Sequence, residues 1–189
     1  MSNIWFTSDL HLGHGKVSEI RGFETPLAHD MTIVANWHES VAQRDQVWVL
    51  GDIATSNLAY ALGVLAGLPG EKHLVAGNHD PVHPMHRKAH TQQPRFDEAF
   101  ASVQPFARRR IDGEDVLLSH FPYNGPGGDR GEIRYPQWRL PDLGEWLLHG
   151  HTHMADQRRH GKQIHVGVDA WNLAPVSIGT ITQLMKENA

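Results

Sequence analysis

Five short polar motifs, each directly after an apolar run, constrain the fold of this chain more than any other feature. The apolar runs begin at residues 4, 47, 73, 116 and 146, and each is short and rich in aliphatic or aromatic side chains, as strands are. The motifs that follow them are, in order, Asp9-Leu10-His11, Gly51-Asp52, Gly77-Asn78-His79-Asp80, Ser119-His120 and Gly150-His151-Thr152-His153. This pattern predicts an α/β fold in which polar side chains gather where strands end.

The residue types in these motifs predict a site for divalent metal ions. Carboxylate, imidazole and carboxamide groups are ligands that borderline divalent ions accept, and the chain has no cysteine to supply thiolates. The motifs together supply enough of these groups to hold two ions. Asp52 follows a glycine that allows a sharp turn, and its two carboxylate oxygens could bridge a pair of ions.

Two of the motifs repeat the same two-residue spacing. In extended backbone, the side chains of Asp9 and His11 would point to one side, and His151 and His153 would do the same. Two such pairs could therefore hold one ion from opposite sides.

The ordered series of motifs resembles the calcineurin-like metallophosphoesterases, and it extends from residue 9 to residue 153. A lone Gly-Asp is a weak signal, but five motifs in one order make a specific one. The resemblance implies that the first metal is held by Asp9, His11, Asp52 and His153. It implies that the second is held by Asp52, Asn78, His120 and His151. It also implies a catalytic role for His79, beside the metals and not as a ligand.

The chemistry of phosphate esters explains why such a centre is useful. Two cations roughly 3.5–4 Å apart can bind phosphate oxygens and acidify a water between them, so a hydroxide that bridges the ions is the expected nucleophile. The departing alkoxide also needs a proton, and an imidazole with a reference pKa of ~6.5 suits that task. His79 is the candidate proton donor. Asp80 either orients this catalytic group or holds the turn through its own backbone, and both roles stay open.

Two loops leave the metal motifs and are candidates for substrate binding. Residues 81–94 contain three histidines and three prolines, and residues 121–141 are rich in glycine and proline. Arginine suits forked contact with phosphate. The candidate substrate contacts are His14, which follows His11 by three residues, and Arg130, Arg134 and Arg139. The alternatives are that the arginines pair with nearby acids in solvated connectors and that His14 stabilises its loop.

The motifs also narrow the reaction class. Gly51-Asp52 continues into Ile53, whereas protein serine/threonine phosphatases with this core have Asp-Arg-Gly after the Gly-Asp motif. The chain is therefore more similar to small bacterial or phage-type phosphoesterases, and phosphodiesters or cyclic nucleotides are the favoured substrates. Alternatives are a phosphomonoesterase acting on nucleotides or small molecules, a nuclease, and a non-catalytic metal-binding scaffold. A scaffold has no use for His79, which favours an enzyme.

The expected cofactors are two divalent ions, with Mn²⁺ favoured and Fe, Zn, Ni or Co also compatible with oxygen and nitrogen ligands.

Length and composition fit a single domain over residues 1–189, because 40% hydrophobic content with six tryptophans can form a sizeable core. A net charge of −4 and a pI near 6.4 argue against duplex nucleic acid as a partner. No apolar stretch approaches the roughly 20 residues of a membrane span. The absence of a basic leader and of cysteine favours the cytoplasm, and the oligomeric state stays open.

Hydrophobic periodicity predicts how the elements are ordered. Helical spacing covers residues 29–42 and 58–66, between the early strands. After residue 106 short strands predominate, at 107–111, 115–119, 147–149, 163–168 and 177–184. Two mixed sheets packed face to face with helices outside would result, and the resemblance implies the same four-layer α/β/β/α sandwich. Asp112-Gly113 reads as a hairpin turn, so the preceding arginines 108–110 should lie on an edge strand. His149 and Asp169 are interpreted as structural.

Overall fold

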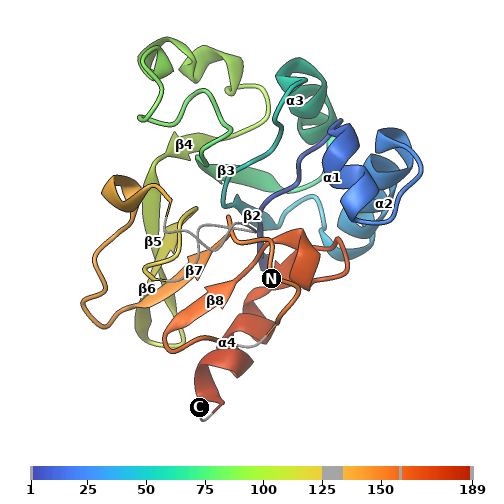
Figure 1. The fold of residues 1–189 in the computed structure, drawn as a ribbon. Coiled ribbons are helices and arrows are strands. Elements are labelled where there is room, and N and C mark those ends of the chain that lie inside the picture. Colours follow the sequence, from blue (N-terminus) through green and yellow to red (C-terminus); the bar gives the residue numbers. More distant parts are fainter. Residues whose placement is uncertain (1, 125–133, 158, 188–189) are drawn as a thin grey trace.

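The computed structural model describes residues 2–124, 134–157 and 159–187. The first of its two sheets contains β1 (Ile4–Thr7), β2 (Gln46–Val49), β3 (Glu71–Val75), β4 (Ser102–Gln104) and β9 (Val176–Ser177). The second contains β5 (Phe106–Ile111), β6 (Glu114–Ser119), β7 (Trp146–His149) and β8 (Gln163–His165). Helices flank the sheets (Figure 1). The predicted α/β fold of two mixed sheets flanked by helices is confirmed.

Both sheets combine parallel and antiparallel pairs. The first has the order β4-β3-β2-β1-β9, in which only β9 runs antiparallel to its neighbour. The second has the order β5-β6-β7-β8, in which β5 and β6 are antiparallel. Since neighbouring parallel strands end at the same edge of a sheet, the motifs that follow β1, β2 and β3 meet at one edge. The motifs after β6 and β7 meet in the same way in the second sheet.

The described residues form four α-helices: α1 (Gly15–Ile20), α2 (Pro26–Ser40), α3 (Leu58–Gly67) and α4 (Ile178–Lys186). Before each helix, the side chain of the capping residue accepts a backbone N–H of the first turn. Thr25 accepts a hydrogen bond from the backbone N–H of Ala28, and Pro26 occupies the first turn of α2. Asn57 caps α3 in the same way. The helices predicted over 29–42 and 58–66 are therefore present, and α2 begins three residues earlier because of its cap.

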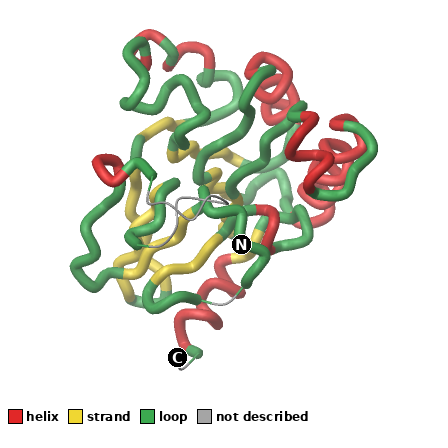
Figure 2. Tube along the Cα trace, viewed as in Figure 1, coloured by secondary structure: helices red, strands yellow, loops and turns green. Residues whose placement is uncertain are grey.

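Two hydrophobic clusters hold these layers together. The first lies between the first sheet and the helices, where Ile33 and Trp37 of α2 and Leu65 of α3 are fully buried. The second lies between the two sheets and includes Phe6 from β1 and Leu148 from β7. Strands occupy the middle of the molecule, helices lie at its periphery, and loops cover the ends of the strands (Figure 2).

The strand predicted over residues 177–184 is wrong. Only Val176 and Ser177 pair with β1, and the chain then enters α4, where the Ser177 hydroxyl accepts the backbone N–H of Thr180. The β-branched residues in this segment suggested a strand. However, Ile178, Ile181 and Leu184 are spaced by three residues, and this helical spacing places them against the cluster between the sheets.

Smaller elements complete the fold. Asp112 and Gly113 both have positive φ, of 50° and 85°, as a two-residue hairpin turn requires, and they join β5 to β6 as predicted. β5 lies at the edge of its sheet, so the prediction for arginines 108–110 is also confirmed. Neither α1 nor β4 was predicted, and β8 is shorter than the predicted strand. The 3₁₀ helices are η1 (Ala89–Thr91), η2 (Gln93–Arg95), η3 (Pro136–Trp138) and η4 (Val168–Ala170). Among the described residues, no helix is both long and apolar enough to span a membrane.

Candidate metal centre

Potential metal ligands gather in two clusters at the ends of the strands. In each cluster, three residues offer ligand atoms that all lie within 4.8 Å of one another. We define the first cluster as Asp9, His11 and His153, and the second cluster as Asp52, His120 and His151 with Asn78. Asn78 is included because its Oδ1 lies 3.1 Å from Nε2 of His120. The fold thus brings all seven residues of the expected ligand set together.

Two imidazole nitrogens converge in the first cluster. Nε2 of His11 lies 3.2 Å from Nε2 of His153. The opposite nitrogen of each ring is already engaged, by the Thr55 hydroxyl at 2.9 Å and by the Asp169 carboxylate at 2.9 Å. A carboxylate only accepts, so Nδ1 of His153 carries a hydrogen. Burial lowers the pKa of His153, but the hydrogen bond to Asp169 and the charge of Asp9 outweigh burial and raise it. Nε2 of each ring faces the other ring and the carboxylate of Asp9, so in their neutral forms the two rings could bind one metal ion together with Asp9.

In the second cluster, imidazole nitrogens and side-chain oxygens also face one another. Nδ1 of His120 donates to the carbonyl of Leu50 at 2.7 Å, which directs Nε2 toward Asn78 and toward Oδ2 of Asp52 at 3.4 Å. Nε2 of His151 is buried and has no hydrogen-bond partner among the described residues. A buried, unpaired polar atom is costly unless something satisfies it. A bound cation would satisfy this nitrogen and the neighbouring oxygens together.

Asp52 belongs to the second cluster and also faces the first. Its Oδ2 is 3.4 Å from Nε2 of His120 and 3.9 Å from Nε2 of His11, which belongs to the first cluster. Its Oδ1 accepts the backbone N–H of His79 at 2.9 Å. Burial raises the pKa of Asp52, but His120 and the other neighbouring imidazoles outweigh burial and lower it, so this carboxyl group is ionised.

Burial and charge separate the histidines into two kinds. Burial lowers the pKa of His11 and of His151, each to about 3, so both rings are neutral and able to bind a metal. Burial also lowers the pKa of His120, but attraction to Asp52 outweighs it and raises that pKa to about 9. Without a cation at the centre, a proton on His120 therefore balances the carboxylate.

The backbone at the ligands differs from the extended conformation that the two-residue spacing predicted. Asp9 and His11 have φ of 58° and 47°, and His151 and His153 have φ of 71° and 51°. Alternation across a strand does not operate in left-handed backbone, and His151 joins the second cluster while His153 joins the first. The expectation that both pairs hold one ion from opposite sides is therefore wrong. Left-handed non-glycine residues cost of order 1–3 kcal/mol each and concentrate at functional sites.

Gly51 allows the loops of the second cluster to approach one another. Its φ is 89°, and a Cβ placed on it would lie 2.5 Å from the backbone nitrogen of Gly77 and 2.7 Å from Nδ1 of His120. No larger residue fits there without moving backbone. The glycine of the Gly-Asp motif thus permits contact between the loops after β2, β3 and β6.

His79 lies at the open side of the two clusters. Its side chain is 42% exposed, and its Nε2 lies 3.9 Å from Oδ2 of Asp52. Its ring centroid is 5.5 Å from that of His11. A side chain in this position can reach both the clusters and a solvent-borne substrate.

Asp80 makes a different set of contacts. Its buried carboxylate accepts backbone N–H groups from Gly77 at 2.7 Å, Asp52 at 2.9 Å and Ile53 at 3.1 Å. Burial and the charge of Asp52 raise the pKa of Asp80 to about 7, against the lowering effect of these hydrogen bonds. Its contacts join the loop after β2 to the loop after β3, which favours the loop-holding interpretation of Asp80.

The candidate substrate contacts lie at varied positions. Nδ1 of His14 accepts the backbone N–H of Val17 at the start of α1, which favours its loop-stabilising alternative. Arg134 is exposed and donates to the hydroxyl of Tyr135, whose ring is 5.6 Å from that of His151. Arg139 donates to backbone carbonyls of the same loop, including that of Pro122 at 3.2 Å. Arg130 lies outside the described residues.

Asp169 was interpreted as structural, but it contacts the first cluster through His153. It also forms an ion pair with Arg21 at 2.7 Å, and both residues lie next to the candidate ligands. A signal for Asp169 was present, because Gly167-Val168-Asp169 follows β8 as the other motifs follow their strands. Arg21 had no such signal, since it lies at the end of a short helix. His149 is buried as expected and donates to the carbonyl of Gly150.

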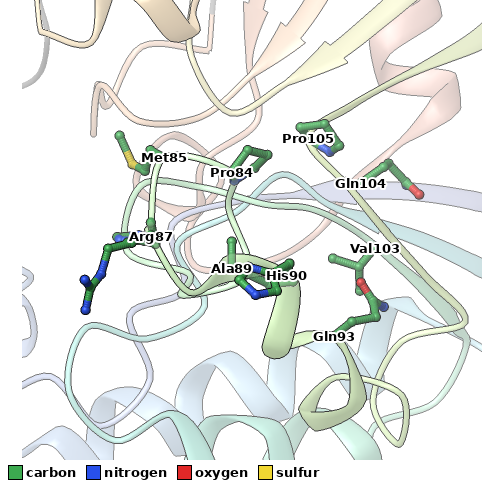
Figure 3. A pocket seen from close by; sticks show the side chains of 11 residues that line it. Pro84, Met85, Arg87, Ala89, His90, Gln93, Val103, Gln104 and Pro105 are labelled. Atoms are coloured by element: carbon green, nitrogen blue, oxygen red, sulfur yellow. The ribbon is translucent and has the colours of Figure 1, made fainter.

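A pocket of about 620 Å³ lies beside the loop after β3. It is formed by the segment from Val82 to Gln93 and by the end of β4 and the residues after it, through Pro105 (Figure 3). His86 lines it and donates from Nε2 to the backbone carbonyl of Asn78 at 3.0 Å. His86 thus connects this pocket to Asn78 of the second cluster.

The chain is similar in sequence to two phage proteins and in fold to one solved structure. The chain is 45% identical to the gene 66 protein of Mycobacterium phage L5 over 90% of this chain and 88% of that protein. It is 46% identical to the gene 66 protein of Mycobacterium phage D29, over 91% of this chain and 90% of that protein. A protein of unknown function from Aquifex aeolicus, AQ665, has a similar fold, with a TM-score of 0.72 and 24% identity over 97% of this chain and all of that one.

The family comparison assigns the chain to a superfamily. The model of the calcineurin-like phosphoesterase superfamily domain matches residues 3–180, which include both clusters. Two groups of carboxylate and imidazole side chains, at loops that follow strands of two facing sheets, are what a metal-dependent enzyme of this kind requires. This protein belongs to the calcineurin-like phosphoesterase superfamily and is a metal-dependent hydrolase of phosphate esters.

Proposed function

We propose that this enzyme hydrolyses phosphodiesters at a centre that takes two divalent cations, with Mn²⁺ as the expected ion. The position of Asp52 carries the proposal, because its Oδ2 faces imidazoles of both clusters, at 3.4 Å and 3.9 Å. Asp9, His11 and His153 would hold the first cation. Asn78, His120 and His151 would hold the second, and Asp52 would be shared.

When bound, the two cations would orient phosphate oxygens and increase the acidity of a water molecule. The residues of the chain have separate tasks around them. Thr55 and Asp169 fix the rings of His11 and His153 through Nδ1, and the carbonyl of Leu50 fixes that of His120. Rings held in this way present Nε2 without reorganisation, which is how surrounding hydrogen bonds tune ligands.

His79 would supply the proton that the leaving group needs. An alkoxide is a poor leaving group unless it is protonated as the bond to phosphorus breaks, and imidazole is the side chain best suited to donate near neutral pH. Its exposed position beside Asp52 supports this role. The backbone N–H of His79 donates to Oδ1 of Asp52, which ties the donor loop to the shared carboxylate.

Two observations favour a diester over a monoester. A monoester carries an additional negative charge, for which a fixed cation at the centre would be useful. The guanidinium of Arg21, close to the first cluster, is 5% exposed and donates to Asp169, His29 and backbone carbonyls, so its donors are already engaged. The pocket lined by His86, whose Nε2 donates to the backbone carbonyl of Asn78, could accept a second substituent, and its volume lies within the range of small-molecule sites.

The test compares two substrates on one preparation. The protein is stripped with chelator, reconstituted with Mn²⁺, and assayed with bis(p-nitrophenyl) phosphate and p-nitrophenyl phosphate at the same pH. We expect chelation to abolish activity, Mn²⁺ to restore it, and the diester to have the higher kcat/KM. Activity that survives complete metal removal would contradict the metal-dependent mechanism. A clear preference for the monoester would replace the diester proposal with a phosphomonoesterase.

A further inference from the structure

A chain of polar contacts, most of them partly buried, lies beside the first cluster and connects two parts of the fold. Asp9 and His11 follow β1 of the first sheet, whereas His153 follows β7 of the second. Arg21, at the end of α1, and Asp169, in η4, lie next to this junction. Asp169 contacts the ring of His153, and Arg21 contacts both Asp169 and the backbone at Asp9.

Asp169 determines which nitrogen of His153 faces the cluster. Its Oδ2 accepts a hydrogen bond from Nδ1 of His153 at 2.9 Å, so the hydrogen of the neutral ring is on Nδ1 and the lone pair of Nε2 points toward His11. A carboxylate that holds a metal-binding histidine through its second nitrogen fixes the ring orientation and raises the basicity of the ligand. The side chain of Asp169 is 15% exposed and that of His153 is 35% exposed, so the bond is partly shielded from solvent.

Arg21 fixes the position of Asp169. Its Nε and Nη2 donate to the two carboxylate oxygens at 2.8 Å and 2.7 Å, which is the forked geometry that arginine provides. Asp169 therefore has both oxygens engaged, and it cannot rotate away from His153 without losing two charge-assisted bonds.

The same guanidinium holds the other side of the cluster. Nη2 of Arg21 donates to the backbone carbonyl of Asp9 at 2.8 Å, and Nη1 donates to that of Leu10 at 3.3 Å and to Nε2 of His29 at 3.0 Å. Together with the bonds to Asp169, all five N–H groups of Arg21 have an acceptor. His29 accepts at Nε2 because its Nδ1 donates to Asp30 at 2.7 Å. Lysine, with three donors on one nitrogen, could not make these five contacts.

We propose that Asp169 and Arg21 are positioning residues of the first metal site, with Arg21 holding the backbone at Asp9 and, through Asp169, the ring of His153. The inference rests on the proposed function, because it assigns these residues to one of its two metals. The proposed role is confined to the first metal site. Asp169 contacts the first cluster, whereas Leu50 and Asp80 hold residues of the second cluster.

The test measures Mn²⁺ binding, without substrate, in two single-site backgrounds. His151→Ala impairs the second cluster and His11→Ala impairs the first. Adding Asp169→Ala should weaken Mn²⁺ binding about 10- to 100-fold in the His151→Ala background, and should leave it unchanged in the His11→Ala background. Asp169→Asn keeps one acceptor and should give a smaller loss, and Arg21→Lys should weaken binding with the same site selectivity. Free Mn²⁺ is measured by electron paramagnetic resonance.

A matched control separates positioning from general stability. Asp45 is also buried, and its carboxylate accepts the backbone N–H groups of Asn3 and Ala42 and the indole N–H of Trp5. Asp45→Ala should lower the thermal midpoint of the metal-free protein without changing Mn²⁺ affinity in the His151→Ala background.

The possible outcomes distinguish this inference from the proposed function. Equal losses from Asp169→Ala in both backgrounds, or a loss from Asp45→Ala as large as that from Asp169→Ala, would overturn the positioning role while two metals still bind. A wild-type chain that binds no Mn²⁺ would overturn the proposed function itself. If neither single-site background binds Mn²⁺, the wild-type chain is used, and Asp169→Ala should weaken one of its two sites. An equal loss of Mn²⁺ affinity at both sites of Asp169→Ala, relative to the wild-type chain, would then contradict the inference.

Discussion

The carboxylate of Asp80 accepts the backbone N–H of Asp52 at 2.9 Å, so the residue shared by the two clusters is held in place by an acid from the neighbouring loop. The same carboxylate accepts the N–H groups of Ile53 and Gly77. Asp52 itself has left-handed backbone, with φ of 55°. The hydrogen bonds that Asp80 accepts thus support the left-handed conformation of Asp52, which the local sequence alone would not favour.

Asp80→Ala should therefore lower both stability and metal affinity. Three backbone N–H groups lose their acceptor, and each buried group left unsatisfied costs about 1–3 kcal/mol. The measurements are the urea midpoint of the metal-free protein and its Mn²⁺ affinity. A variant with unchanged stability and metal affinity but reduced turnover would instead indicate that Asp80 orients His79.

Asp52→Asn should weaken both metal sites at once. The substitution removes a charge that both clusters face, and an amide offers only one oxygen. Elemental analysis after dialysis should find less than two equivalents of Mn²⁺, with neither site retained at full occupancy. As a control, Asp112→Asn alters an exposed acid that pairs with Lys186 and should leave the metal content unchanged. Loss of one metal alone would contradict the shared role of Asp52.

His79→Ala should separate chemistry from metal binding. The variant should keep two metals and lose on the order of 10²–10⁴ in turnover for a substrate with a basic leaving group, because proton donation by a positioned side chain contributes about that much. The loss should be smaller for a nitrophenolate, which departs with little help. Equal losses for both leaving groups would assign His79 to phosphate binding or to positioning the water.

Filling the pocket that His86 lines should affect the diester selectively. Ala89 lines the pocket, and Ala89→Trp should reduce kcat/KM for bis(p-nitrophenyl) phosphate while leaving that for p-nitrophenyl phosphate unchanged. Ala59 lines a different pocket at α3, so Ala59→Trp is the matched control and should change neither value. Equal losses for both substrates with Ala89→Trp would mean that the pocket does not bind the second substituent.

The stability of the metal-free protein should fall as the pH drops from 7 to 5, and His83 should contribute to this fall. Burial lowers the pKa of His83 from 6.5 to about 4. Between these two pH values, His83 is protonated in the unfolded chain and stays neutral in the folded chain. The stabilisation is fully present above pH 6.5 and is lost as the pH approaches 4. In His83→Phe, which keeps a ring between Phe121 and Trp138, the difference between the unfolding free energies at the two pH values should be smaller. An identical difference would contradict the assignment.

The sequence by itself predicted most of the strands along the chain, and its resemblance to a family named the seven candidate ligands that the fold brings together. Polar motifs after apolar runs are a local property, and parallel strands bring their ends together, so the positions of residues such as Asp52 and His120 could be predicted from the chain. The same local signals failed at residues 177–184, because β-branched residues suit a strand as well as a buried helix face. Packing of Ile181 against the cluster between the sheets selected the helix.

Only the tertiary structure decided how the ligands divide and what holds them. His151 and His153 are two residues apart, but their left-handed backbone directs them to different clusters, which no spacing rule for extended chain anticipates. Asp169 and Arg21 are 148 residues apart, and Arg21 had no motif to identify it. Their contact exists because both lie beside the chain that leaves β1: Arg21 donates to the carbonyls of Asp9 and Leu10, and Gly167, just before η4, bridges to Ser8. A positioning residue can be identified only from the side chain that it contacts, and that contact forms only when the chain folds.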